Sequence, residues 1–458
     1  MIKQLIFVAF CIIFSVSSVS AASQVTEYSL DNGLKILIKE DHRAPVVVSQ
    51  VWYKVGASNE HLGITGISHV LEHMMFKGTK NLAPGEFSKI IAANGGRENA
   101  FTSRDYTGYY QQLANDRLPI SFKLEADRMR NLVLLEEEFA KEIKVVMEER
   151  RMRVEDNPQQ YMVERFMATA FLNSPYQNPV VGWMNDLENM TLADLQVWYE
   201  KWYAPNQATL VVVGDVQPEE VLKLAKKHFG PHKPDTPTAV KPRKEIVQKG
   251  IKRMVVKVPA QLPLLLMGYH VPGVADAKEK WEPYALDVLA AIFDGGNSAR
   301  FPTELVRGSQ IATSTGISYS NFARHNVLFV FSGVPSQGHT VADIEAAFRE
   351  QLKRIQETPP SQEELDRLKA QVVAEKVYEQ DSVFYQAMQL GGLSSTGLDW
   401  RLADQYADNI RGITADQVQK VAQKYFHDDN LTVGTLDPQP INPATANRRL
   451  SSGGSHAH

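Results

Sequence analysis

The chain has 458 residues, more than one hydrophobic core usually organises, so its length predicts two or more domains. A hydrophobic fraction of 43% and a charged fraction of 22% lie in the range of globular proteins. The formal net charge of −4 excludes a bulk electrostatic attraction to nucleic acid, so no nucleic acid partner is expected.

The first residues are typical of a secretory signal peptide. Lys3 precedes an apolar run over residues 5–14, and a small-residue site follows at 19–21. The run is short for a membrane span, although an uncleaved N-terminal anchor is the alternative. Residues 1–22 are therefore predicted to be a signal peptide, and the protein is expected to be exported, to the periplasm if its source is a Gram-negative bacterium.

Cys11, the only cysteine, lies inside this leader, so the mature chain is expected to contain none. Disulfides and cysteine metal ligands are then excluded. Any metal site must be built from His, Asp and Glu. His456 and His458 lie in a Ser/Gly-rich end, which favours a flexible tail over metal ligation.

Strand and helix patterns follow the leader. Residues 25–30 and 34–38 read as strands around Asp31-Asn32-Gly33, a strong hairpin turn signal. The next predicted elements are a strand at 46–55, helices at 64–76 and 84–93, a strand pair at 99–103 and 106–113, and a long charged helix at 136–154.

A Pro-rich run separates two stretches that repeat one pattern. Thr191 begins a predicted helix that is followed by a Val-rich strand, and Thr414 begins the same pattern 223 residues later. We therefore predict an α+β fold of two related halves, each a mostly antiparallel sheet covered by helices, joined by a linker. The predicted domains are a signal peptide at 1–22, an N-terminal domain at 23–230, a linker at 231–250, a C-terminal domain at 251–440 and a flexible tail at 441–458.

The segment His69-Val70-Leu71-Glu72-His73 carries the strongest chemical signal. Two imidazoles one helical turn apart share a face, which is the spacing that two ligands of one tetrahedral Zn²⁺ need. Glu72 lies within reach of a water on that metal, in the H-x-x-E-H order of inverted zinc peptidases. A weak alignment of the halves places Leu286, Leu289 and Ala290 opposite His69, Glu72 and His73, so the second half is expected to bind no metal.

A third ligand must come from elsewhere, and the long helix offers several carboxylates. Glu142 and Glu149 lie seven residues apart on one face, whereas Glu148 points about 100° away from Glu149. Spacing alone does not choose among them, and a solvated acidic helix face is the alternative for most.

Three segments, 66–79, 99–110 and 142–149, closely resemble the pitrilysin family, which includes insulin-degrading enzyme and the mitochondrial processing peptidase. The resemblance covers essentially the whole mature chain. It implies one Zn²⁺ per chain, with Glu149 as the third ligand beside His69 and His73. It also implies that Glu142 orients the site. The implied activity is a zinc-dependent endopeptidase in which Glu72 is the general base.

The resemblance further implies a chamber in which an unfolded peptide adds as a strand to a sheet edge. The matching edge residues are Asn99, Ala100, Phe101 and Thr102. Family members often hold the substrate carbonyl with an Arg and a Tyr from the second half. Arg307 matches the Arg, but Thr313 or Ser314 stands where the Tyr would fall.

Two explanations of the missing Tyr stay open. Tyr319 is one substitute, and a related subunit in a heterodimer that supplies an Arg/Tyr pair is the other; a homodimer also fits. A non-catalytic or assembly subunit is the alternative function, although such relatives typically have degraded motifs. A metal-carrying protein without peptidase activity is a third hypothesis.

Overall fold

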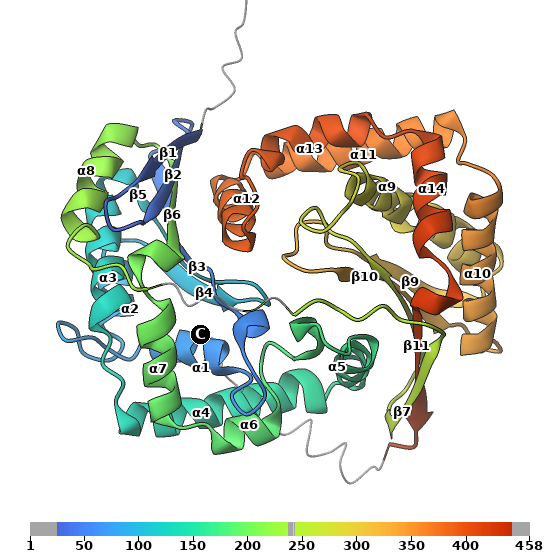
Figure 1. Cartoon of the computed structure of the whole chain (residues 1–458), viewed down its shortest axis with the longest axis horizontal. Coiled ribbons are helices and arrows are strands. Elements are labelled where there is room, and N and C mark those ends of the chain that lie inside the picture. The colour runs from blue at the N-terminus through green and yellow to red at the C-terminus, as the bar shows by residue number, and fades with distance from the viewer. Residues whose placement is uncertain (1–24, 237–240, 242, 442–458) are drawn as a thin grey trace, which may run out of the picture.

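A computed structural model of the chain describes residues 25–236, 241 and 243–441. The predicted signal peptide, Cys11, His456 and His458 lie outside the described residues. Two α+β halves stand side by side, each with one sheet and its own helices (Figure 1). The predicted fold class is therefore confirmed. In the described part of the chain, every helix is too short or too polar to cross a membrane.

The first half holds a six-stranded sheet in the order β1-β2-β6-β3-β5-β4, in which only the β2–β6 pair is parallel. Its strands are β1 (Val25–Ser29), β2 (Lys35–Glu40), β3 (Val46–Tyr53), β4 (Arg97–Thr102), β5 (Thr107–Ala114) and β6 (Ala208–Gly214). Its helices are α1 (Ile67–Met74), α2 (Glu86–Ala93), α3 (Leu118–Asn131), α4 (Glu136–Arg150), α5 (Pro158–Ala170), α6 (Met184–Asn189), α7 (Leu192–Trp202) and α8 (Pro218–His228).

The second half holds a five-stranded sheet in the order β7-β11-β8-β10-β9, in which only the β7–β11 pair is parallel. Its strands are β7 (Lys252–Pro259), β8 (Leu264–Val271), β9 (Ala312–Ser318), β10 (Val327–Pro335) and β11 (Leu431–Gln439). Its helices are α9 (Glu282–Asp294), α10 (Val341–Glu357), α11 (Gln362–Glu379), α12 (Val383–Thr396), α13 (Leu402–Arg411) and α14 (Ala415–Tyr425).

The two sheets repeat one topology. Strands β2, β6, β3, β5 and β4 match β7, β11, β8, β10 and β9 in order and direction, with β1 added to the first sheet. Thr191 and Thr414 cap the equivalent helices α7 and α14 with their side-chain oxygens. Helix α1 packs on α7 as α9 packs on α14, so α1 and α9 occupy corresponding places.

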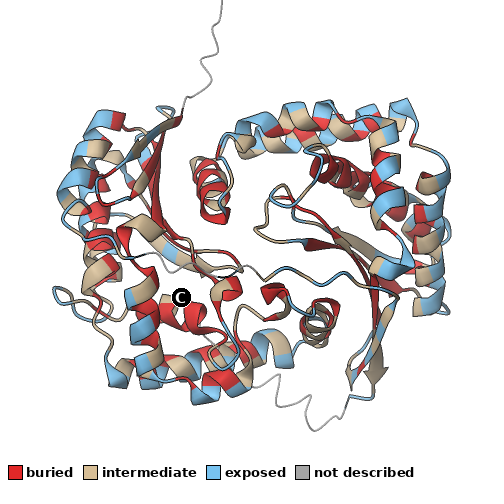
Figure 2. Cartoon of the chain, viewed as in Figure 1, coloured by how far each residue is buried: buried red, intermediate tan, exposed pale blue. Residues whose placement is uncertain are grey.

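One helix from each half packs on the sheet of the other half. Helix α12 contacts β3 and β6 of the first sheet, where Gly391 permits a close approach: a Cβ there would lie 2.1 Å from the Trp52 indole. Helix α5 contacts β7 and β11 of the second sheet and inserts Met162 and Phe166 into its core. The central strands of each sheet are therefore buried on both faces, as Figure 2 shows. The sequence patterns did not predict this exchange.

Helix boundaries differ from the predictions where the backbone changes conformation. Helix α1 begins at Ile67 rather than at residue 64, because Gly66 has a left-handed φ of 88°. Helix α4 ends at Arg150, and residues 151–155 continue as a π-helical turn. In contrast, β1 and β2 pair in the predicted hairpin. Of the predicted linker, residues 241 and 243–250 contain no helix or strand.

Candidate metal centre

Helix α1 presents two histidines on one face because its opposite face is apolar and buried. The rings of His69 and His73 lie one turn apart, with centroids 4.9 Å from each other and planes at 85°. The apolar face packs into the core of the first half through Ile67, Val70, Leu71 and Met74. The histidines are thus fixed by the packing of the helix that carries them.

Two buried carboxylates hold the start of α1. Glu60 accepts hydrogen bonds from the N–H of Gly66 at 2.7 Å and of Ser68 at 2.9 Å. Asp186 accepts bonds from the N–H and hydroxyl of Thr65. These acceptors stabilise a helix start whose N–H groups have no partner within the helix. Burial raises the pKa of Glu60 to about 7. Sequence reasoning missed both acids, which have no motif of their own.

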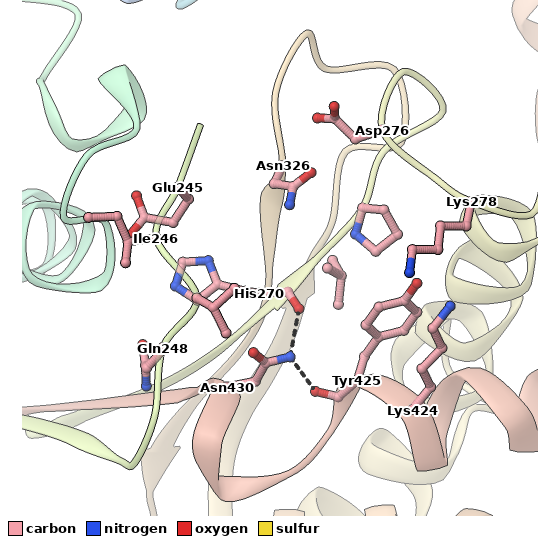
Figure 3. Close-up of a pocket in the computed structure, with 13 residues that line it drawn as sticks. Glu245, Ile246, Gln248, His270, Asp276, Lys278, Asn326, Lys424, Tyr425 and Asn430 are labelled. Carbon is pink, nitrogen blue, oxygen red and sulfur yellow. Dashed lines mark hydrogen bonds between the residues drawn. The ribbon is translucent and has the colours of Figure 1, made fainter. Parts of the chain in front are cut away.

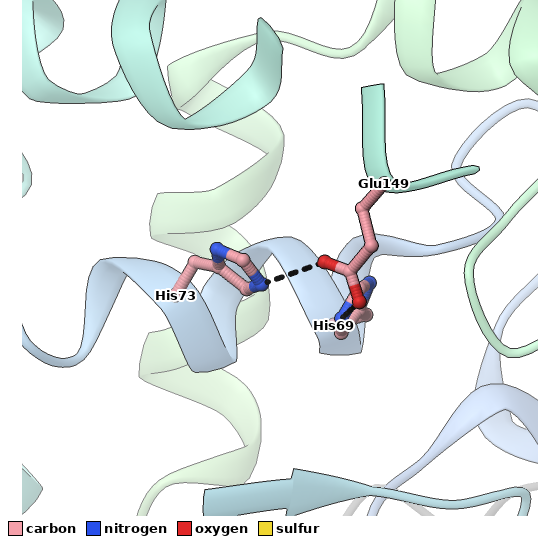
Figure 4. A group of neighbouring side chains, drawn as sticks. All are labelled: His69, His73 and Glu149. Atoms are coloured by element: carbon pink, nitrogen blue, oxygen red, sulfur yellow. Dashed lines mark ion pairs between the residues drawn. The ribbon is translucent and has the colours of Figure 1, made fainter. Parts of the chain in front are cut away.

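Glu149, near the end of α4, faces the two histidines (Figure 4). Its carboxylate oxygens lie 3.8 Å from His69 Nε2 and 3.5 Å from His73 Nε2. The ligand atoms of the three residues all lie within 4.8 Å of one another. Two ligands of a tetrahedral zinc ion stand roughly 3.3 Å apart, given bond lengths of about 2.0–2.1 Å. The two nitrogens and one carboxylate therefore fit a single zinc ion.

A second carboxylate orients one of the imidazoles. His73 Nδ1 lies 3.1 Å from Glu142 Oε2, and the other oxygen of Glu142 lies 2.7 Å from Lys77 Nζ. A hydrogen bond at Nδ1 leaves Nε2 free to face the position between the ligands. Glu148, in contrast, is largely exposed and pairs with Arg151 at 3.1 Å. The structure thus gives Glu149, Glu142 and Glu148 different contacts, whereas helical spacing alone did not show which of them lies near the histidines.

Burial and these neighbours set the protonation of the imidazoles. Burial alone would lower the pKa of His73, but hydrogen bonds with Glu142 and Glu149 raise it to about 9. Burial, together with the neighbouring His73, lowers the pKa of His69 to about 4. Without a metal at neutral pH, His73 therefore holds a proton between two carboxylates. That proton must leave before both imidazoles can bind one cation.

Glu72 is turned from α1 toward the edge strand β4. Its carboxylate accepts a hydrogen bond from the hydroxyl of Thr102. Burial raises the pKa of Glu72, and the bond from Thr102 partly opposes this shift. A partly buried carboxylate with a raised pKa is suited to accept a proton near neutral pH.

The predicted peptide-binding residues lie on β4, the last strand of the first sheet. Asn99 pairs with Tyr110 and Thr102 pairs with Thr107, both on β5. Among the described residues, no strand covers the other edge of β4, so this edge is open to an extended chain. Of the predicted residues Asn99, Ala100, Phe101 and Thr102, the last contacts Glu72, so the end of this edge strand lies beside that carboxylate.

A close backbone contact sets the spacing between α1 and α4. A Cβ at Gly182 would lie 2.4 Å from the carbonyl oxygen of Thr65, so the two loops touch through glycine. Arg150, which follows Glu149, donates to the Gly182 carbonyl at 2.7 Å and pairs with the buried Glu164. This contact fixes the end of the helix that carries Glu149 against the start of the helix that carries the histidines.

The predicted contribution of the second half is not assembled at the metal centre. Arg307 Nη2 donates to Asn297 and Thr303, within its own segment. The Tyr319 hydroxyl donates to the carbonyl of Pro272 at 2.8 Å. Both side chains therefore form hydrogen bonds within the second half. The substrate-binding role of Arg307 stays a prediction.

A separate cavity of about 300 Å³ lies in the second half (Figure 3). Its wall includes His270, whose Nε2 lies 3.1 Å from the carbonyl oxygen of Ala170. Lys424, on the same wall, pairs with Glu282. Lys424 and the Nε2 of His270 thus have structural partners, while His270 Nδ1 has none among the described residues. The three converging side chains of the metal centre offer more chemistry than this cavity.

The chain is similar to known proteases over most of its length. The family described as "Insulinase (Peptidase family M16)" matches residues 35–182, which include His69, Glu72, His73 and Glu149, and "Peptidase M16 inactive domain" matches residues 189–372. Zinc protease PqqE of Helicobacter pylori is 33% identical over 417 residues, which cover 90% of this chain and 92% of that protein.

Solved structures agree with this similarity. The crystal structure of a protease from Helicobacter pylori superposes with a TM-score of 0.86 and 31% identity, covering 91% of this chain and 100% of that one. The periplasmic protease PqqL from Escherichia coli shares the fold, with a TM-score of 0.77 and 18% identity over 94% of this chain and 50% of that one. The chain therefore belongs to the M16 family of peptidases.

Proposed function

We propose that this chain is a zinc-dependent endopeptidase that hydrolyses extended, unfolded polypeptide segments. One observation carries the proposal: His69, His73 and Glu149 converge from two helices on one position. Glu72 lies on the same helix as the histidines and contacts the edge strand through Thr102. A metal-carrying protein needs the three converging ligands, but it does not need a carboxylate that contacts an edge strand.

Each residue has a role that follows from its contacts. When bound, zinc supplies a Lewis acid that polarises the scissile carbonyl and lowers the pKa of water. Glu72 accepts a proton from the attacking water and delivers it to the leaving amine. Glu142 holds the His73 ring through Nδ1, so that Nε2 faces the metal position.

The edge strand accounts for the proposed substrate class. Backbone hydrogen bonds to β4 require an extended partner but tolerate many side chains. A folded protein keeps its own strands paired and cannot offer a free one. The substrates are therefore unfolded peptides of varied sequence.

We expect the purified chain to cleave an internally quenched, flexible peptide and to lose this activity in a metal chelator. One equivalent of zinc per chain should restore it, because three protein ligands hold one ion. A compact folded protein should stay intact under the same conditions and serves as the control. Full cleavage by protein shown by mass spectrometry to be free of metal would contradict the proposal.

Replacing Thr102 with Val should move the acid limb of the kcat/KM profile to higher pH. The Thr102 hydroxyl bond lowers the pKa of Glu72, so its loss raises that pKa, and the base then becomes protonated at a higher pH. Thr102→Ser keeps the hydroxyl and should keep the position of the limb. If the acid limb of the kcat/KM profile does not move in Thr102→Val, the Thr102 hydroxyl bond does not lower the pKa of Glu72 in the active protein.

A peptidase that needs a related subunit is the second candidate. The Tyr319 hydroxyl and the Arg307 guanidinium already bond within the second half, which favours a partner that supplies the Arg/Tyr pair. Adding a co-purifying relative should then raise kcat/KM more than additively. Full activity of the isolated chain would remove this candidate.

We also propose that the protein is exported. The basic residue and apolar run at its start support a signal peptide. The fold relative from Escherichia coli, described as periplasmic, is consistent with this location.

A further inference from the structure

Two adjoining cavities lie between the end of the first helix layer and the second sheet, and they share part of their walls. The first has a volume of about 610 Å³ and includes Arg153, whose guanidinium pairs with Glu149. The second has a volume of about 290 Å³ and reaches β8 and β10 of the second sheet. The two share three lining residues, Arg104, Val163 and Met167. Arg104 therefore lies at the junction of a path that begins beside a metal-centre carboxylate.

Arg104 has an unusual lack of partners. Its Nε is buried and makes no hydrogen bond within the described part of the chain, and no described carboxylate forms an ion pair with its guanidinium. Its guanidinium lies over the Tyr176 ring, with the ring centroid 5.6 Å from Cζ. The adjacent Asp105 is directed elsewhere, because it accepts bonds from Ser58, Tyr176 and the N–H of Arg324.

A guanidinium cannot shed its charge at physiological pH, so enclosing it with no directly paired anion costs free energy, which the nearby Asp105 carboxylate offsets only in part. A ligand carboxylate would satisfy it, because the planar fork of Arg matches two carboxylate oxygens. The walls around it are mainly apolar and suit an aliphatic or aromatic group next to that carboxylate. They include Phe166, Phe171, Phe322 and Leu328.

Arg104 also lies where a bound peptide passes. It follows Thr102, the last residue of β4, by two positions, and Thr102 contacts Glu72. A peptide that pairs with β4 and extends past this end of the strand would run toward Arg104, which lines both cavities. Arg104 and Arg153 are the only Arg or Lys side chains among the described residues that line the first cavity.

We propose that Arg104 binds a carboxylate of the peptide substrate and makes this subsite selective for chains that carry one near the cleavage position. The proposal rests on the peptidase function proposed above. The carboxylate has two sources, the C-terminus of a short peptide and the side chain of Asp or Glu. Both offer the same planar pair of oxygens.

The test compares three forms of one fluorescent peptide with the zinc-loaded Glu72→Gln protein, in which the peptide is not consumed. One form is neutral with a C-terminal amide, one has a free C-terminal carboxylate, and one is an amide with Glu in place of Gln at positions flanking the scissile bond. Fluorescence anisotropy measures Kd for each. We expect one charged form to bind about tenfold more tightly than the neutral form, and that form identifies the source.

Adding Arg104→Gln should reduce this preference to within about twofold. Arg253→Gln is the matched control, because Arg253 lies on β7 and pairs with Glu345, away from both cavities. It should leave the preference intact. Equal binding of all three forms overturns the proposal, and so does a preference that survives Arg104→Gln.

If Arg104→Gln fails to fold, Arg104→Lys keeps the charge but loses the planar fork, and it should lower the preference partially. The preference for a charged peptide over the neutral one is measured in the protein that keeps Arg104, so it does not depend on Arg104→Gln. Binding does not need turnover, so loss of the peptidase proposal leaves this test valid. Normal zinc-dependent turnover without any preference overturns the subsite alone.

Discussion

Glu72→Gln is expected to lower kcat/KM for a flexible peptide by about 10³-fold, within the 10²–10⁴-fold range of general base catalysis. The Gln side chain keeps the size of Glu72 and an oxygen that accepts the Thr102 hydroxyl, but it cannot take a proton from water. The zinc content should stay near one ion per chain, because Glu72 is not among the three converging ligands. Peptide cleavage and metal analysis of the same preparation measure both quantities.

Glu137→Gln is the control for this substitution. Glu137 is exposed in the first turn of α4, and its loss should leave kcat/KM within about twofold of the starting protein. Unchanged turnover in Glu72→Gln would show that another group acts as the base. Loss of zinc together with turnover would instead place Glu72 among the residues that hold the metal.

Local chemistry made several elements predictable from the sequence. The Asp31-Asn32-Gly33 turn allows only a tight hairpin, and Gly33 has the left-handed φ of 83° that it requires. The helical period places His69 and His73 on one face whatever surrounds the helix. Thr191 and Thr414 mark equivalent helices because each side chain caps its own helix. In each case the determining contacts lie within a few residues.

The choice of Glu149 could not come from spacing, because it depends on contacts distant in sequence. The end of α4 is held against the start of α1 where Gly182 meets Thr65 and where Arg150 reaches the Gly182 carbonyl. No period within α4 contains that information. The resemblance to a known family implied Glu149 as the ligand, and the structure brings its carboxylate within reach of the two imidazoles.

Contacts between the halves were also beyond the sequence patterns. Helix α12 reads as an ordinary helix, yet Gly391 is the residue that lets it approach Trp52 of the other half. Arg104 belongs to a segment that resembles the family, but its lack of a partner is visible only in three dimensions. Glu60, which follows a short helical turn, and Asp186, on α6, likewise reach the start of α1 only through contacts made in three dimensions.

Three carboxylates of one helix should differ sharply in their effect on zinc. Glu149→Gln removes the anionic ligand and should weaken zinc binding by more than about 100-fold, beyond the roughly 10–100-fold typical of an outer partner. Glu142→Gln should fall inside that range, because it loosens the hold on His73 Nδ1 without removing a ligand. Glu148→Gln should change the zinc Kd by less than about twofold, since Glu148 is largely exposed and pairs only with Arg151 among the described residues.

Competition with a chromophoric chelator at fixed pH measures all three Kd values. The pH must be fixed because zinc displaces a proton from His73, whose pKa is raised to about 9. The apparent zinc affinity should therefore rise with pH through the neutral range. The order of the three variants depends on geometry alone, because they remove the same charge from the same helix. If Glu148→Gln and Glu149→Gln lose the same amount of zinc affinity, the overall negative charge of α4 retains the metal, rather than one converging carboxylate.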